Sequence, residues 1–514
     1  MSTPATNPND TYTSPLSARN ASPEMCHIWS PRHKFNTWRR VWLAVAQAQC
    51  EVSGGELVTK EQVEELRAVV EREGGITDAE LVRAGELEAE LRHDVMAHVH
   101  CLGEQCPKAM PIIHLGCTSQ DVVCNADLLI LSDAGRLIDA KLRRAIGMWA
   151  DIATKHAKLP TLGFTHYQPA QPTTVGRRAA NWAYELWRIA NGIETGDEGY
   201  FLRGFRGATG TQASFLALFD NDSQRVDHFE QVAMCLLRFG EDGYQKLKGR
   251  WESHKHLGTG AFYLTGQTYP RVVDAEILSG LASAASVLHK IATDIRLLSN
   301  RKELDEPFGK NQIGSSAMPY KRNPMKCERI CGLTRFVMNL VGNAYDTAAT
   351  QWLERTLDDS SNRRLSLPES FLALDGALDL MYTVADGLVV NEAMVRKNLM
   401  AELPFLATEN IMMEAVKLGG DRQELHERIR VHAQAAGARV KQEGLENDLI
   451  ERLRGDAAFA SVHDLLTPEK LLDPMQYVGR SVEQTERFVR EVVEPLRERY
   501  ADELGGLGSA DRGV

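Results

Sequence analysis

The residues best suited to chemistry gather in one polar stretch, Asn311–Pro324, which reads N-Q-I-G-S-S-A-M-P-Y-K-R-N-P. It combines a Gly-Ser-Ser turn, two prolines, a Lys-Arg pair and an asparagine. Gly314 can adopt backbone angles closed to other residues, and the prolines fix φ, so the stretch is suited to deliver side chains to a ligand. An ordinary connection between helices has a similar composition, so this stretch alone supports both interpretations.

Two other clusters suit proton transfer and polar binding. His166 lies in T-H-Y-Q-P-A-Q-P, and a histidine in a loop stiffened by prolines can exchange protons near neutral pH. Arg92–His100 carries three histidines, but His93 and His98 lie five residues apart, whereas helical zinc ligands lie at i and i+4. We therefore expect a polar pocket there and no metal site.

Three further clusters could bind anions. Thr118 and Ser119 precede a helical run, where hydroxyl and backbone N–H groups form an anion seat, although both could simply cap the helix. Gly204–Thr211 has a glycine at every third position but matches neither nucleotide-binding glycine motif. Glu354–Arg364 contains three arginines, which form either a solvated surface or, facing a pocket, a phosphate clamp.

These clusters lie at the ends of long runs without interior proline, apart from Pro368 in the first turn of the last run. Helices of that length would be roughly 30–50 Å long, well beyond the usual three turns. The run from Val272 is apolar on nearly every face and must be buried on nearly all sides. One chain can hardly cover five such helices, so we expect an all-α fold whose central bundle is completed by other copies of the chain. The runs are Asn125–Lys158, Thr173–Ile193, Val272–Asn300, Pro324–Trp352 and Leu367–Val389.

Shorter helices are predicted on both sides of this bundle. Helical spacing of apolar residues predicts a helix over Thr37–Val52, and Thr59 opens a capping box for a second one. The acidic stretch Gly74–Glu90 is interpreted as a connection, and shorter helices resume near Asn391. The expected divisions are a disordered tail over 1–17, an N-terminal helical domain over 18–118, the bundle over 119–390, a C-terminal helical domain over 391–504 and a disordered tail over 505–514.

Composition limits the partners and the compartment. The chain has 514 residues, and its net charge of −11 argues against a general nucleic-acid or membrane-surface binder. Any anionic ligand must therefore meet clustered arginine and lysine. Residues 1–17 lack the features of a signal or transit peptide, and no window approaches 18 consecutive apolar residues, so we expect no membrane span. The nine scattered cysteines contain no C-x-x-C and predict reduced thiols in the cytoplasm.

Several motifs together resemble a known family. G-S-S-A-M-P-Y-K-R-N-P is similar to the signature loop of the fumarase/aspartase superfamily, whose members eliminate or add across a C–N or C–O bond and release fumarate. Further motifs resemble, in the same order, the adenylosuccinate lyase family of the eukaryotic type, from about Ser14 to about Leu496. They are S-A-R-N-A-S-P-E-M, R-H-D-V-M-A-H-V-H, G-F-T-H-Y-Q-P-A-Q, T-G-T-Q-A-S-F, T-G-Q-T-Y and E-R-T-L-D-D-S-S-N-R-R.

The resemblance implies a reaction and the residues that carry it out. The family cleaves adenylosuccinate to AMP and fumarate, and the related ribonucleotide SAICAR to AICAR and fumarate, in purine synthesis. It uses no metal or organic cofactor and forms a homotetramer whose sites are each built from three subunits. By family match Ser315 is the general base and His166 the general acid. Lys321 would activate the serine, and Glu328 would orient the histidine.

The same resemblance implies the substrate contacts. The succinyl carboxylates would be bound by Thr118, Ser119, Lys321 and Asn323. The nucleotide end would be bound by Arg19, Asn20, Arg355, Ser360 and Arg364. The remaining matched positions are Arg92, His93, Asp94, Gln267 and Arg329. The chain departs from the family pattern at Asn20, where the pattern has tyrosine, so a stacking or hydroxyl contact to the phosphate or ribose is missing.

Two other functions are compatible with parts of this pattern. One is a superfamily lyase or cycloisomerase that acts on another dicarboxylate, such as argininosuccinate lyase or a carboxymuconate cycloisomerase. The Arg/Ser-rich cluster at 354–364 favours a phosphate-bearing substrate instead. The other is a non-catalytic scaffold that retains the fold. The joint presence of Ser315, His166, Lys321 and Asn323 argues against it.

Overall fold

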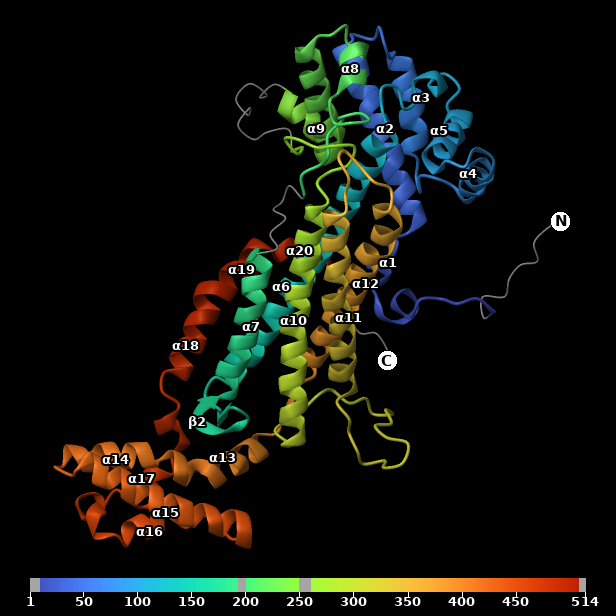
Figure 1. The fold of residues 1–514 in the computed structure, drawn as a ribbon. Coiled ribbons are helices and arrows are strands. Elements are labelled where there is room, and N and C mark those ends of the chain that lie inside the picture. Colours follow the sequence, from blue (N-terminus) through green and yellow to red (C-terminus); the bar gives the residue numbers. More distant parts are fainter. Residues whose placement is uncertain (1–9, 193–199, 249–259, 508–514) are drawn as a thin grey trace. The chain divides into compact units, whose positions relative to one another are not determined.

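The computed structural model describes residues 10–192, 200–248 and 260–507, and helices dominate this part of the chain (Figure 1). Its named strands form two small two-stranded sheets, so the expected all-α fold is confirmed. The chain divides into two compact units. Unit 1 comprises Met1–Ala140, Asn191–Ser286 and Leu333–Ala377, and unit 2 comprises Lys141–Ala190, Val287–Gly332 and Leu378–Val514.

The long helices agree with the predicted runs, but two of them begin earlier. Val272–Asn300 is predicted to the residue, whereas Ser119 and Asp359 begin helices that were predicted to start at Asn125 and Leu367. Consequently Ser119 is the first residue of one helix, whereas Arg363 and Arg364 lie near the start of another that Arg355 precedes and that contains Pro368. The five helices are α6 (Ser119–Lys155), α7 (Val175–Gly192), α10 (Val272–Asn300), α11 (Met325–Ala349) and α12 (Asp359–Asp386).

Helix α10 is half-buried within the chain. Among the described helices it alone is long and apolar enough to cross a membrane, although the sequence contains no continuous apolar window of that length. Half of its most apolar window is buried against the rest of the chain. A core helix of a globular protein has the same length and composition, and the other half of this window is left for further contacts.

Unit 1 contains the N-terminal helices and the pair that follows residue 212. Helix α2 begins at Pro31 rather than Thr37, because Ser30 Oγ accepts a hydrogen bond from His33 N at 3.2 Å and proline suits the first helical position. The capping box at Thr59 is confirmed. The helices are η2 (Leu16–Asn20), α1 (Pro23–Ile28), α2 (Pro31–Val52), α3 (Lys60–Val70), α4 (Asp78–Leu91), α5 (Asp94–Gln105), η3 (Met110–Ile112), α8 (Ala213–Leu218) and α9 (Ser223–Lys248).

Helix α4 replaces the connection predicted over Gly74–Glu90. Thr77 and Glu80 form a second capping box, in which each side chain accepts a hydrogen bond from the other residue's backbone N–H. Ala84 and Leu87 are buried against α5. The T-x-x-E pattern was therefore present, but the acidic composition of this stretch obscured it.

A β-hairpin leads into α7 in unit 2. Strands β1 (Pro160–Thr165) and β2 (Gln168–Thr174) pair antiparallel, with Thr165 opposite Gln168. The connection is therefore His166-Tyr167, and both residues have positive φ, 52° and 57°. Two-residue hairpin turns of this kind match the twist of the strands. The segment predicted as a proline-stiffened loop is thus the tip of a hairpin.

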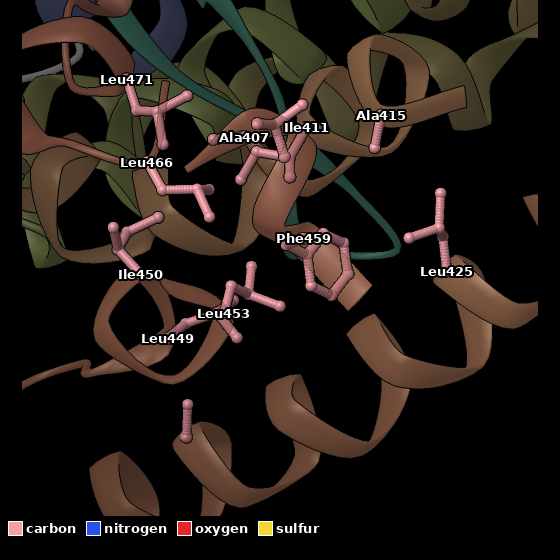
Figure 2. Packing of buried hydrophobic residues seen from close by; sticks show 12 residues of the cluster. Ala407, Ile411, Ala415, Leu425, Leu449, Ile450, Leu453, Phe459, Leu466 and Leu471 are labelled. Atoms are coloured by element: carbon pink, nitrogen blue, oxygen red, sulfur yellow. The ribbon is translucent and has the colours of Figure 1, made fainter. Parts of the chain in front are cut away.

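The C-terminal part of unit 2 has a small hydrophobic core of its own, shown in Figure 2. It is built mostly from short helices, as expected beyond Asn391, although α15 has 22 residues. They are α13 (Glu392–Leu406), α14 (Thr408–Lys417), α15 (Arg422–Glu443), α16 (Leu449–Arg454), η5 (Ala457–Val462), α17 (Pro468–Leu471), η6 (Pro474–Tyr477), α18 (Ser481–Phe488), η7 (Val489–Val493), α19 (Glu494–Arg499) and α20 (Ala501–Gly506). Strand β3 (Leu304–Asp305) pairs with β4 (Val389–Val390).

The two compact units do not test the predicted division into three helical domains, so this division stays a prediction. Residues 1–9 and 508–514, where tails were predicted, lie outside the described residues. The described parts of those predicted tails include the beginning of η2 and the end of α20.

Candidate active site

Unit 1 contains a cavity of about 660 Å³. Its walls come from the start of α2, the α4–α5 connection, the first turns of α6 and α12, and the segment just before α10. Three of the predicted clusters, and Gln267 of the T-G-Q-T-Y motif, therefore meet here although they are far apart in the sequence. The predicted substrate-binding residues that line it are Arg92, His93, Asp94, Thr118, Ser119, Gln267, Arg355, Ser360 and Arg364.

Direct contacts join three of these clusters. His93 caps the start of α5, and its Nε2 lies 3.4 Å from Ser119 Oγ on the first turn of α6. Asp94 Oδ2 accepts a hydrogen bond from Arg364 Nη2 at 3.2 Å. Arg92 ends α4 in the left-handed conformation, with φ of 56°. A non-glycine residue in this conformation is uncommon, and here it turns the chain from α4 into α5 at the cavity wall.

A buried carboxylate organises the arginines on one side of the cavity. Asp359, which is 1% exposed, accepts hydrogen bonds from Arg271 Nε at 2.7 Å and from Arg355 Nη2 at 3.3 Å. Arg355 Nη1 also donates to Gln267 Oε1 at 3.3 Å. Because each buried guanidinium has an anionic partner, this part of the cavity is rigid before any ligand binds.

A second buried network lies beside it. Arg363 donates to Asp274 at 2.6 Å and to Asp127 at 3.0 Å, and it also contacts the Tyr269 hydroxyl. Burial raises the pKa of the Tyr269 phenol, so the phenol stays neutral and donates to Asp274 Oδ1 at 2.5 Å. The adjacent arginine, Arg364, is largely exposed and available to a ligand.

Asp121 anchors two polar loops to α6. Its carboxylate is fully buried, contacts Arg203, and accepts hydrogen bonds from the backbone N–H groups of Arg206 at 2.9 Å, Gly207 at 3.1 Å and Thr118 at 2.7 Å. The Thr118 contact, three residues before Asp121, is a helix-cap contact, as the alternative interpretation had it, and the same carboxylate ties this cap to the loop of Arg206 and Gly207. The glycine-rich segment Gly204–Thr211 has a structural role here.

The signature loop, Asn311–Pro324, belongs to unit 2 and joins the region after α10 to α11 (Figure 1). A side chain at Gly314 would lie 2.1 Å from the Lys321 carbonyl oxygen, so only glycine fits. Asn323 Nδ2 donates to the Gly314 carbonyl at 2.9 Å, which closes the base of the loop. Ser315 Oγ accepts a hydrogen bond from Met318 N at 3.2 Å.

The predicted catalytic groups lie on the surface of unit 2. His166, Lys321 and Glu328 are exposed, and Ser315 is half-buried. In the described segments no hydrogen bond or ion pair joins His166 to Ser315 or to Glu328. Each of the four groups lies on a segment that the structure describes. Among the described residues of a single chain, none of the pairings that the resemblance implies is formed.

Some predicted residues do not line the cavity, and some lining residues were missed. Arg19 is exposed on η2, and Asn20 Nδ2 donates to the Pro15 carbonyl at 2.8 Å. The remaining predicted residues, Asn323 and Arg329, belong to unit 2. The lining residues that the sequence did not single out include Lys34, Asp127 and Arg271. Lys34 and Asp127 stand in helices outside the motifs, whereas Arg271 follows the T-G-Q-T-Y motif by two residues and could have been found from it.

The three histidines of Arg92–His100 do not converge. His93 lies at the cavity, His98 is buried and stacked on Phe35 with ring centroids 3.7 Å apart, and His100 is exposed. Within the described residues no group of three or more metal-ligating side chains is found. All nine cysteines are free in the structure, and the reducing compartment that they predict stays a prediction.

Comparison with known proteins agrees with these motifs. A family model described as "Lyase" matches residues 17–236 and 247–339, and one described as "Adenylosuccinate lyase C-terminus" matches residues 404–488. An adenylosuccinate lyase of Saccharomyces cerevisiae is 47% identical over 499 residues, which cover 96% of this chain and 98% of that protein. The chain belongs to the adenylosuccinate lyase family. Proteins of the same name from Schizosaccharomyces pombe and Schistosoma mansoni are 47% and 42% identical, over 94% and 96% of this chain and 95% and 97% of theirs.

Solved structures of proteins with other names share the fold of this chain. A fumarate lyase from Mesorhizobium sp. BNC1 has a TM-score of 0.74 at 22% identity and covers 97% of this chain and 100% of its own. A 3-carboxy-cis,cis-muconate lactonizing enzyme from Pseudomonas putida has the same TM-score at 24% identity, over 94% and 99% of the two chains. At this identity the likeness concerns the fold.

Proposed function

We propose that this member of the adenylosuccinate lyase family eliminates fumarate from adenylosuccinate, giving AMP, and from SAICAR, giving AICAR. The observation that carries the proposal is the unit 1 cavity, around which nine predicted substrate-binding residues gather with several arginines. A nucleotide monophosphate needs such a cationic pocket of several hundred cubic ångströms. No metal or organic cofactor takes part in the proposed reaction.

The reaction breaks a C–H bond and a C–N bond and forms a C=C bond. Ser315 takes the proton from the carbon next to a succinyl carboxylate, the electron pair forms the double bond, and the purine or carboxamide nitrogen leaves. A serine hydroxyl is a weak base, so it needs stabilisation as the alkoxide. The N–H group of Met318, which donates to Ser315 Oγ, and the charge of Lys321 support this role.

The leaving nitrogen receives a proton from His166. An exposed histidine at a hairpin tip can enter a partner's pocket, and Glu328 would orient its imidazole there. Thr118, Ser119, Lys321 and Asn323 bind the two carboxylates, with Gln267 and Arg329 beside them. Arg355, Ser360 and Arg364 bind the phosphate and ribose end, which Arg19 and Asn20 would approach from the N-terminal segment.

We also propose a homotetramer in which each site combines groups from different subunits. Two observations support it: the catalytic groups are exposed in one chain, and half of the apolar window of α10 is not buried by that chain. Apolar side chains on α10 and α11 are also exposed, among them Val272, Phe336 and Tyr345. A cytoplasmic location fits the reduced thiols.

One assay tests the activity against its rivals. Purified protein is incubated separately with adenylosuccinate, argininosuccinate and carboxymuconate, and the products are separated by chromatography. We expect AMP and fumarate from the first and no turnover of the other two. Cleavage of argininosuccinate alone would overturn the proposal, and no turnover of any of the three would favour the non-catalytic scaffold.

A further inference from the structure

We infer that Lys34 provides an additional contact to the phosphate group of the nucleotide bound in the unit 1 cavity. The inference rests on the proposed function, because it identifies a further specificity-determining residue of that site. Lys34 lies in the first turns of α2, lines the cavity, and belongs to none of the motifs that resemble the family.

An aromatic platform fixes the position of the Lys34 ammonium. Its Nζ lies 4.9 Å from the centroid of Trp38 and 5.1 Å from that of Phe35. Trp38 is fully buried, and Phe35 stacks on His98 at 3.7 Å between centroids. A cation over two ring faces is attracted by their quadrupoles. The platform therefore directs the ammonium toward the cavity without neutralising its charge.

Lys34 differs from most other bases of the cavity in having no carboxylate partner. Arg271 and Arg355 contact Asp359, Arg363 contacts Asp127, and Arg364 contacts Asp94. In the described part of the chain, the Lys34 ammonium makes no hydrogen bond or ion pair, whereas the backbone N–H of this residue donates to the Ser30 carbonyl at 3.1 Å. A half-buried cation without an anion is unfavourable, so its position is best explained by an anion that arrives with the ligand.

The charge balance of the cavity identifies that anion. Lys34 and five arginines face four carboxylates, those of Glu88, Asp94, Asp127 and Asp359, so two positive charges are in excess. A phosphate monoester carries close to two negative charges at neutral pH. Without Lys34 the excess would be one charge.

The electrostatic surroundings of Lys34 point to the phosphate end. Burial lowers the pKa of the Lys34 ammonium, and among nearby charges Arg364 lowers it further while Asp127, Asp94 and Glu88 raise it. Lys34 and Arg364 therefore repel each other across the cavity. A dianion between them relieves this repulsion and favours the charged form of the lysine.

The test compares ligands with and without the phosphate. The dissociation constants of AMP and adenosine are measured by calorimetry for the full-length wild type and for Lys34→Gln. We expect Lys34→Gln to weaken AMP binding about tenfold and to leave adenosine binding unchanged. Lys34→Arg, which keeps the charge over the platform, should restore most of the AMP affinity. Arg40→Gln removes an exposed charge from the same helix and serves as the matched control, with no change expected.

Each other outcome overturns the inference. Equal losses for AMP and adenosine would mean that Lys34 only supports the platform, and an unchanged AMP constant would mean that it does not meet the phosphate. If Lys34→Gln does not fold, Lys34→Met, which keeps the aliphatic stem on Trp38, provides the same comparison. Turnover of adenylosuccinate by the wild type is measured separately, so failure of the proposed function is distinguished from failure of this inference.

Discussion

The unit 1 cavity and the Ser315 loop of unit 2 differ in how deeply their polar side chains are buried and in how many contacts these side chains make. Around the cavity, charged side chains are buried and paired, as in the contacts of Asp359 with Arg271 and Arg355. At the loop and the hairpin, Ser315 and His166 are half-buried or exposed and have few contacts. Under the proposed function, one chain would therefore hold its substrate-binding side chains in place before the ligand arrives, whereas the proposed proton-transfer groups would gain their contacts only in the assembled site.

Physical chemistry explains why the two regions differ. A buried charge without a partner is strongly unfavourable, so a pocket for a polyanion must pair its cations internally until the ligand arrives. A general base or acid must instead approach the reacting atom and be released after turnover. In the proposed tetramer the ligand and a neighbouring subunit would supply the contacts that the exposed groups lack.

The largest effect is expected at the loop. Ser315→Ala should lower kcat by about a thousandfold, the scale of a lost general base, while AMP binding and the melting temperature stay near those of the wild type. The reason is that Ser315 contributes one hydrogen bond to the loop and lies outside the lining of the cavity. Fumarate release measures kcat, titration calorimetry measures AMP binding, and scanning calorimetry measures the melting temperature. Ser316→Ala, at the exposed neighbouring serine, is the matched control and should retain most of the activity.

Mixing two inactive variants tests whether different subunits supply the catalytic groups. If Ser315 and His166 of one site come from different chains, random reassembly of Ser315→Ala with His166→Ala restores both groups in about a quarter of the sites. Activity should therefore recover to roughly that fraction of the wild type after unfolding and reassembly of the mixture. Reassembly of either variant alone is the control. Absence of recovery in correctly assembled mixed tetramers would place both groups on one chain and break the contrast.

The sequence predicted the long helices and the polar clusters because both are local patterns. The apolar run of α10 and the capping box at Thr59 need no partner to be recognised. The hairpin around His166 was missed, since its turn contains no glycine or asparagine although both residues have positive φ. Lys34 gains its surroundings from segments far away in the chain, and no spacing in the sequence indicates it. Asp121 was indicated as a possible helix cap, but its contacts with Arg203 and the Arg206 backbone come from a distant segment and were not indicated.

The next effect concerns the stability of the cavity. Asp121→Asn removes the negative charge from a carboxylate that contacts fully buried Arg203 and accepts three backbone hydrogen bonds. We expect the free energy of unfolding to fall by about 3–5 kcal/mol, because a buried guanidinium loses its counter-charge. Urea unfolding followed by circular dichroism measures the change.

An exposed ion pair provides the control for Asp121→Asn. Asp78 contacts Arg32, and its side chain is 90% exposed, so Asp78→Asn should change the free energy of unfolding by less than about 1 kcal/mol. Similar losses in the two variants would show that the buried network does not stabilise unit 1 more than a surface pair does.

The smallest effect concerns the pH dependence of the free energy of unfolding, and it is expected at His98. Burial, followed by the charges of Arg39 and Lys34, lowers the pKa of His98 to about 4 from the usual histidine value of 6.5. Between these two values the unfolded chain binds more protons at this residue than the folded chain does. The free energy of unfolding therefore falls as the pH falls from about 6.5 to about 4, by up to about 1.4 kcal/mol per pH unit. His98→Gln should flatten this slope over that window, whereas His100→Gln, at an exposed position on the same helix, should leave it unchanged. Subtracting the unfolding curves of variant and wild type removes the contribution of all other titrating groups. An identical slope in His98→Gln would mean that the buried imidazole does not oppose protonation.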